Sequence, residues 1–348
     1  MGQEAALKFV SVAIFKHASA ESCGNLLLIG NSGTGKTSIM RAIEGMYATE
    51  RHFEKHRVVV RMNANTLASE EGAVITGTQL LKTLQERATR ILGKDASPSQ
   101  IRTLMEHATI CVDEVDKISA TVGKMPNPVG LNLQQSLLTL MEDEAVVFDT
   151  HVLHEGKYKP VQMQVQTAGM LFLCGGAFEE LYDQVYARVV EEGKQESLGQ
   201  MVEGLDGNMD FKEVFKLEEH LIQEDLFRYG IMPQFLSRFE STLILKELKP
   251  AELEQIFRMP GGLFETSRAF FRKRNVELVL TPEASRLIAE RASLQPRVGA
   301  RALKDVYSRV IQPYEFDPDH EGALKRVGDG IPVLTLTEDM VKKNTKLA

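Results

Sequence analysis

The hydrophobic positions of this chain form two patterns that alternate along it. Short apolar runs at 25–29, 57–61, 109–112 and 170–174 predict buried strands, and a strand-like run covers 242–245. In other stretches the apolar residues recur every three or four positions, which predicts amphipathic helices over 3–19, 38–43, 79–88 and 131–144. Strands that alternate with helices predict a parallel sheet covered by helices on both faces, so the expected fold class is α/β.

The pattern changes near Leu248, Lys249 and Pro250. Beyond this point helical spacing dominates, over 251–258, 263–274, 282–292 and 300–310, with one short strand at 276–280. We therefore expect a large sheet domain at 1–247, a smaller and mostly helical domain at 248–325, and a C-terminal tail at 326–348. The acidic stretch 191–210 contains glycines and lacks periodicity, which predicts a surface loop.

Composition narrows the class of protein. With 348 residues, 43% hydrophobic and 26% charged, the chain is typical of a soluble globular protein. Its net charge of −7 disfavours binding to nucleic acid or to an anionic membrane. The cysteines at 23, 111 and 174 form no Cys-x-x-Cys pair, which excludes a zinc ribbon and indicates a reducing compartment. The apolar stretch 9–15 is too short to span a bilayer, so we expect a cytoplasmic protein.

A glycine-rich segment follows the first predicted strand and precedes a predicted helix. Its order of strand, glycine turn and helix is the context of a P-loop, in which backbone N–H groups wrap phosphates at a helix N-terminus. The alternative is an ordinary glycine loop, which the flanking strand and helix disfavour. Lys36 would reach the β- and γ-phosphates, and the Thr37 hydroxyl would bind Mg²⁺. The expected nucleotide-binding residues are Gly30, Asn31, Ser32, Gly33, Thr34, Gly35, Lys36, Thr37 and Ser38.

Two adjacent carboxylates end the strand at 109–112. Strand alternation sends Asp113 and Glu114 to opposite sides, so they cannot share one role. We expect Asp113 to hold the Mg²⁺ hydration shell beside Thr37, and Glu114 to orient and polarise the attacking water. A polar strand end that leads into a turn is the alternative. Arg238 and Arg301 would, taken alone, be surface or capping arginines.

Taken together, these motifs resemble the AAA+ ATPases of the Clp/HslU group, and most closely its ClpX unfoldase branch. The likeness covers most of residues 2–312, in order. It begins at Gly2-Gln-Glu-Ala5 with Ser11-Val-Ala-Ile14, which are similar to the family's adenine-contacting segment, and it includes the P-loop. It continues through Asp113-Glu-Val-Asp-Lys-Ile118, the helix 133–142, Leu173-Cys-Gly-Gly-Ala-Phe178, the segment 225–238 and Gly299-Ala-Arg301.

The resemblance implies roles for the two arginines. Arg238 corresponds to an arginine finger that reaches the γ-phosphate of ATP in a neighbouring subunit, which implies a ring, by resemblance a homo-hexamer. Arg301 corresponds to a sensor-2 arginine that contacts nucleotide in its own subunit. An arginine suits the first role because its fixed fork of donors stabilises spreading negative charge and keeps its proton.

Some positions depart from the family. The pore-loop region 71–77 has no aromatic residue, and Val74 or Ile75 is the nearest substitute. The peptidase-docking tripeptide has only Leu198-Gly-Gln200 as a counterpart, so docking to the peptidase ClpP is not expected. The family's N-terminal zinc module has no counterpart. No sensor-1 side chain is evident at Gly175-Gly176, and His151 with His154 is not expected to bind a metal.

The expected function is therefore an ATPase that uses ATP and Mg²⁺ to remodel or unfold a protein client. An ATP-dependent assembly or signalling scaffold, which forms a ring without threading a substrate, is the alternative. A DNA motor or loader is disfavoured by the acidic balance.

Overall fold

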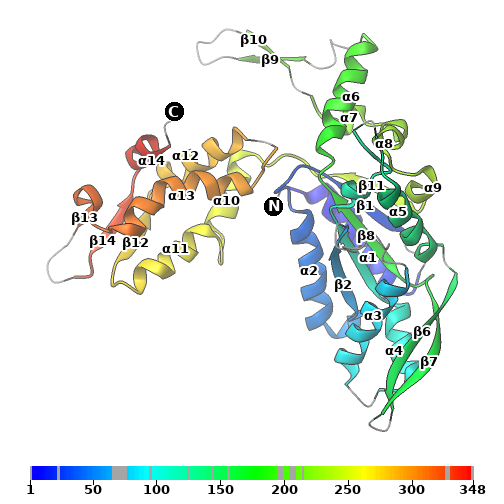
Figure 1. Ribbon diagram of the computed structural model, residues 1–348. Coiled ribbons are helices and arrows are strands. Elements are labelled where there is room, and N and C mark those ends of the chain that lie inside the picture. Colours follow the sequence, from blue (N-terminus) through cyan, green and yellow to red (C-terminus); the bar gives the residue numbers. More distant parts are fainter. Residues whose placement is uncertain are drawn as a thin grey trace. The chain divides into compact units, whose positions relative to one another are not determined.

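The structure is a computed structural model, and its two compact units are described separately (Figure 1). The described residues are 2–21, 24–64, 77–93, 96–123, 125–142, 144–154, 157–193, 199–203, 209–213, 215–295, 297–325 and 330–345. The first unit, here called the sheet unit, comprises Ala5–Gly30 and Lys36–Ile244. The second, the helical unit, comprises Met1–Glu4, Asn31–Gly35 and Leu245–Ala348.

A five-stranded sheet forms the centre of the sheet unit, in the order β11-β1-β8-β3-β2. Every neighbouring pair in it is parallel. The strands are β1 (Asn25–Ile29), β2 (Val59–Asn63), β3 (Thr109–Asp113), β8 (Leu171–Gly176) and β11 (Phe239–Ile244). The three inner strands are almost wholly buried, as expected for a parallel sheet covered on both faces. The predicted α/β fold class is confirmed.

Helices cover this sheet (Figure 1). Their apolar faces join the strands in one hydrophobic core, to which Leu81, Leu84, Leu133 and Leu137 contribute. The α-helices are α1 (Glu4–Ala18), α2 (Lys36–Thr49), α3 (Gly77–Leu92), α4 (Pro98–Glu106), α5 (Pro128–Leu140), α6 (Glu179–Glu191), α7 (Leu217–His220), α8 (Gln223–Tyr229) and α9 (Pro233–Leu236). Short 3-10 turns η1 (Arg51–His56) and η3 (Val115–Ile118) follow α2 and β3.

The described part of the sheet unit also contains three antiparallel ribbons, none of which was predicted from the hydrophobic pattern. They are β4 (Thr121–Val122) with β5 (Met125–Pro126), β6 (Ala145–His154) with β7 (Lys157–Gln166), and β9 (Gly199–Glu203) with β10 (Met209–Glu213). The predicted surface loop at 191–210 is therefore wrong where β9 and the start of β10 lie. Two-residue periodicity in a polar segment is a weak signal, and Pro160 lowers the strand propensity of β7.

The helical unit has its own core. The core packs Phe257, Phe271, Ile288, Val310 and Leu334, all at most 1% exposed. Its helices are α10 (Pro250–Arg258), α11 (Leu263–Arg272), α12 (Pro282–Ser293), α13 (Arg301–Phe316) and α14 (Glu338–Asn344), with the 3-10 turn η5 (His320–Gly322). A small sheet of β12 (Glu277–Leu280), β14 (Val333–Leu336) and β13 (Leu324–Lys325) lies beside them. The predicted smaller, mostly helical C-terminal part is confirmed.

Candidate functional site

The glycine-rich segment forms a tight turn between β1 and α2. Gly33 and Gly35 adopt φ angles of +74° and +110°, which residues with a Cβ adopt only under strain. Helix α2 then begins at Lys36, so Thr37 and Ser38 occupy its first turn. The unbonded N–H groups of such a helix start, with the helix dipole, favour an anion. Backbone conformation and helix start thus have the form of a phosphate cradle.

Lys36 lies at the carboxyl end of the central strands. Its side chain is buried, and its Nζ donates a hydrogen bond to the Gly30 carbonyl. On β8, a Cβ added at Gly175 would lie 3.0 Å from the Met40 side chain and 3.6 Å from the Lys36 Cδ. Gly175 therefore allows α2 and the lysine stem to pack closely against the sheet. This is a packing role for a position to which the sequence analysis assigned no function.

Thr37 and Asp113 meet directly, although they are far apart in sequence. The Thr37 hydroxyl donates a 2.6 Å hydrogen bond to Asp113 Oδ2. The second carboxylate oxygen, Oδ1, accepts the Glu114 backbone N–H at 3.0 Å. Glu114 has a left-handed backbone, with φ 59° and ψ 37°, at a cost of about 1–3 kcal/mol for a residue other than glycine. The chain thus turns sharply between two carboxylates whose predicted roles differ.

This arrangement fits a Mg²⁺–nucleotide complex. Mg²⁺ is typically bound through one or two protein oxygens, with phosphate oxygens and water completing the octahedron, and Thr37 with Asp113 offers such a pair. No cluster of three or more His, Cys, Asp or Glu suited to an all-protein metal site exists among the described residues. A bound Mg²⁺ would supply charge neutralisation to the phosphates. The residues would orient it and the nucleotide, with Glu114 beside them as a candidate base.

Asp116 is a further acidic residue at this edge, and no role was expected for it from the sequence. Its side chain is 1% exposed, and its Oδ1 accepts the Ala177 N–H at 3.1 Å. Lys117 Nζ lies 3.4 Å from the other oxygen. Asp116 therefore ties the turn after β3 to the end of β8. Its position in the Asp-Glu-Val-Asp run at 113–116 is the sequence feature that could have pointed to this residue.

Within the helical unit, Gln3 holds the P-loop turn. Its side-chain amide donates to the carbonyls of Thr34 at 3.1 Å and of Lys246 at 2.8 Å, and its Oε1 accepts the Lys246 N–H. Asn31 Nδ2 adds a 3.3 Å hydrogen bond to Glu247. Gln3 lies in the segment that resembles the family's adenine-contacting region, and here it also fixes the backbone of the turn.

The residues before α13 pack against the same turn. The Ala300 N–H donates to the Gly33 carbonyl at 3.2 Å. A Cβ added at Gly299, where φ is +57°, would lie 2.5 Å from the Ser32 carbonyl oxygen. Arg301 is exposed and is the first residue of α13, directly after this contact. Its backbone is thus beside residues 31–35 of the helical unit.

Arg238 occupies a different place in the sheet unit from the candidate phosphate site. It immediately precedes β11, and its carbonyl accepts from Asn25 Nδ2 at the first residue of β1. Lys36, Thr37 and Asp113 lie at the other end of these parallel strands. The four steps between the five residues of β1, at about 3.3 Å each, separate the two edges by about 13 Å. The Arg238 guanidinium lies 3.3 Å from Glu142 Oε1, and the Arg238 side chain is 40% exposed.

The remaining predicted positions are of two kinds. The pore-loop residues 71–76, Cys23 and Leu198 lie outside the described residues, as does the side chain of Gln200. The other cysteines are buried, and burial raises the pKa of the Cys111 thiol to about 12 and that of Cys174 further. Both are therefore protonated thiols within the core, with no nucleophilic role.

Comparison with known proteins identifies the family. A family model described as an AAA domain (Cdc48 subfamily) matches residues 21–242, more than half of the chain. A second, described as the C-terminal D2-small domain of ClpB protein, matches residues 248–328. The chain belongs to the AAA ATPase family, and as a member it is an ATPase that binds and hydrolyses ATP.

Curated relatives are similar over nearly the whole chain. The ATP-dependent Clp protease ATP-binding subunit ClpX of Azotobacter vinelandii is 26% identical over 348 aligned residues, covering 93% of this chain and 73% of the relative. The ClpX subunit of Treponema denticola is 27% identical, covering 91% and 74%. The chain is therefore a ClpX-like AAA+ ATPase. Among its described helices, none is both long and apolar enough to cross a membrane.

Proposed function

We propose that this chain assembles into a ring, by resemblance a homo-hexamer, and uses ATP hydrolysis to remodel or unfold protein clients. In this proposal Lys36 binds the phosphates, Thr37 and Asp113 hold Mg²⁺, and Glu114 activates the attacking water. Arg301 contacts nucleotide in its own subunit, and Arg238 acts on the nucleotide of a neighbour.

The observation that carries the proposal is the position of Arg238. It and the Lys36–Asp113 group lie at opposite edges of one sheet, so Arg238 cannot stabilise the phosphates bound by its own sheet unit. A partly exposed guanidinium there can serve a second copy. A contact between different edges of identical subunits is heterologous, and such contacts form a ring when the rotation between subunits closes.

A mixing experiment tests this directly. Glu114→Gln and Arg238→Ala are each expected to lower ATP turnover, by about a thousandfold for the arginine. In an equal mixture, about a quarter of the sites should combine an intact Glu114 with an intact neighbouring Arg238, and turnover should return accordingly. Arg258→Ala, which removes a solvent-exposed arginine paired within α10, is the matched control and should keep turnover. A mixture no more active than its components would reject action in trans.

The altered pore-loop sequence favours a second candidate, a scaffold that assembles with ATP but does not thread a client. Residues 71–77 contain no aromatic side chain, which is the rigid group that would grip a polypeptide. Incubation of the ATP-loaded assembly with a folded, tagged fluorescent reporter separates the two. Loss of reporter fluorescence supports remodelling, whereas assembly with an intact reporter supports the scaffold. Docking to a ClpP-type peptidase is not part of either proposal.

A further inference from the structure

The β6–β7 ribbon has two long edges that differ in how they are covered. The two strands pair only with each other in the described part of the chain. Exposed strand edges present unpaired N–H and C=O groups to any extended chain, and proteins usually blunt them. The groups that cover each edge therefore indicate whether another extended chain can pair with it.

Three observations fix which backbone groups point outward. Thr167 N donates to the Glu144 carbonyl, so the 144/167 pair is hydrogen-bonded across the ribbon. Because such pairs alternate in an antiparallel ladder, residues 149 and 151 of β6 and 160, 162 and 166 of β7 direct their backbone groups outward. The outward carbonyl of His151 indeed accepts Gln85 Nε2 at 3.0 Å, and the outward N–H of Gln166 donates to Glu106 Oε1 at 3.1 Å.

The β7 edge is blunted. Pro160 has no N–H at an outward position, Glu106 of α4 accepts the Gln166 N–H, and α4 packs along the strand. Between these two positions, the outward backbone groups of Gln162 and Gln164 have no hydrogen-bond partner among the described residues. On β6, Gln85 of α3 covers only the His151 carbonyl. The outward N–H and C=O of Asp149 and the N–H of His151 have no protein partner among the described residues.

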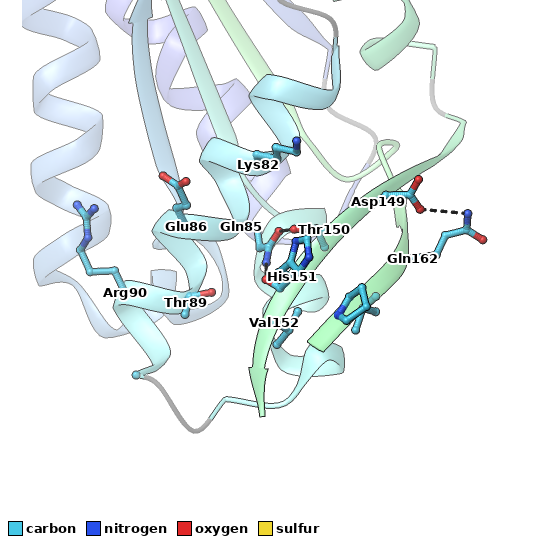
Figure 2. A pocket seen from close by; sticks show the side chains of 13 residues that line it. Lys82, Gln85, Glu86, Thr89, Arg90, Asp149, Thr150, His151, Val152 and Gln162 are labelled. Carbon is cyan, nitrogen blue, oxygen red and sulfur yellow. Dashed lines mark hydrogen bonds between the residues drawn. The ribbon is translucent and has the colours of Figure 1, made fainter. Parts of the chain in front are cut away.

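The β6 edge borders a wide cleft against α3, shown in Figure 2. Its volume is about 1310 Å³, above the roughly 300–1,000 Å³ of usual small-molecule pockets, and it is partly open to solvent. Gln85 crosses its floor, with Oε1 accepting the Thr150 hydroxyl and Nε2 donating to His151 (Figure 2). Besides α3 and β6, the β7 residues Pro160, Val161 and Gln162 line the cleft, so the side chains of Asp149 and Gln162 both face it. The lining carries both charges: Lys82 and Arg90, with Glu86 and Asp149.

We propose that the β6 edge binds an extended segment of a polypeptide, which adds a strand to the ribbon within this cleft. The occupant is defined by its chemistry: a free main chain that donates to the Asp149 carbonyl and accepts from the N–H groups of Asp149 and His151. Such recognition depends on the backbone, and a lining of mixed charge selects no single side-chain type. The inference rests on the proposed function in one respect, that the clients are proteins.

The test measures peptide binding without nucleotide, so that it stands apart from the outcome for ATP hydrolysis. The probe is a fluorescein-labelled peptide of alternating Thr and Val, as long as the 10-residue β6. Its affinity for the full chain is measured by anisotropy, beside a copy methylated at alternate backbone nitrogens. The wild-type chain should bind the first peptide, and methylation should weaken binding at least about tenfold.

Two proline variants make a matched pair. Asp149→Pro removes an outward N–H from β6, whereas Gln162→Pro removes one from β7, the opposite edge. Both lose the same 3.4 Å hydrogen bond between Gln162 Nε2 and Asp149 Oδ1. Asp149→Pro should weaken binding at least about tenfold and Gln162→Pro less than about twofold. Both should keep basal ATP turnover, which reports that they fold.

Amide hydrogen exchange identifies the contact. Added peptide should slow exchange at Asp149 and His151 and leave Gln166 unchanged. Equal affinity of the two proline variants, or no binding at about 1 mM peptide, overturns the proposal. So does slowed exchange that depends on protein concentration without peptide, because the occupant would then be a second copy of the chain.

Discussion

The Thr37 hydroxyl and the Asp113 carboxylate are joined by a 2.6 Å hydrogen bond, which links the P-loop helix to the end of β3. The other oxygen of the same carboxylate fixes the Glu114 backbone. A substitution at Thr37 is therefore expected to affect the positions of both Asp113 and Glu114.

Thr37→Ala removes one proposed Mg²⁺ ligand and the partner of Asp113. We expect ATP turnover to fall about 10- to 100-fold, since such losses are typical for groups that hold or orient a metal. Thr37→Ser keeps the hydroxyl and should retain most of the turnover. Titration with Mg²⁺ at saturating ATP checks the cause, because Thr37→Ala should need more Mg²⁺ for half-maximal rate. An unchanged Mg²⁺ dependence would argue against this role.

Gln3→Ala removes the hydrogen bonds that tie Thr34 to Lys246. A looser P-loop turn should raise KM for ATP several-fold, equivalent to a net loss of about 1 kcal/mol, with a smaller effect on kcat. Gln3→Glu keeps an acceptor for the Lys246 N–H but loses both donors, so its KM should also rise. Steady-state kinetics of both variants decide the point. A KM equal to wild type in Gln3→Ala would show that the turn holds without this side chain.

Gly299→Ala combines backbone strain with a clash, since the new Cβ would lie 2.5 Å from the Ser32 carbonyl oxygen. Gly322 is the control within the same unit: its φ is +69°, with open space around the added Cβ. Gly322→Ala should lose only the strain, about 1–3 kcal/mol. Gly299→Ala should lose more stability in urea unfolding and should also raise KM for ATP. Equal effects of the two variants on KM would reject the contact with the P-loop turn as the cause.

The sheet unit carries a histidine cluster that predicts sensitivity to acid. His17 is buried, its Nε2 lies 3.0 Å from the Gly169 carbonyl, and its Nδ1 lies 3.3 Å from the Tyr47 hydroxyl. Since a carbonyl only accepts, Nε2 carries the proton of the neutral ring. Burial, followed by the nearby His56, lowers the pKa of His17 to about 3. Burial and His107 likewise lower the pKa of His56, and its ring nitrogens have no hydrogen-bond partner among the described residues.

These lowered pKa values set the direction of the pH effect. Each histidine takes up a proton on unfolding below its ordinary pKa of 6.5. The stability they contribute is therefore present above pH 6.5 and is lost as the pH falls toward 3, by up to about 1.4 kcal/mol per pH unit for His17. Urea unfolding between pH 7.5 and 5.5 should show this loss. His56→Phe should reduce it, and substitution of the exposed His52 by Gln should not; an unchanged slope in His56→Phe would contradict the account.

The sequence predicts those features of the site that are formed by residues close together along the chain. The P-loop glycines, Lys36 and the carboxylates after β3 follow from a strand-turn-helix motif and from parallel strands, whose carboxyl ends share one edge. The contacts of Gln3 with Thr34 and of Gly299 with Ser32 bring together distant segments, and neither side leaves a periodic signal. The hydrophobic pattern did not predict the β6–β7 ribbon. Buried and polar residues alternate along its strands, and β7 contains a proline.

The opposite placement of Arg238 and Lys36 in one subunit has a genetic consequence if the subunits form the proposed ring. A copy that lacks Arg238 keeps its own phosphate-binding residues and disables the copy beside it. In a cell that makes both forms, the altered allele would be dominant. Each mixed assembly would contain unaltered subunits that cannot hydrolyse ATP because the neighbouring subunit lacks Arg238.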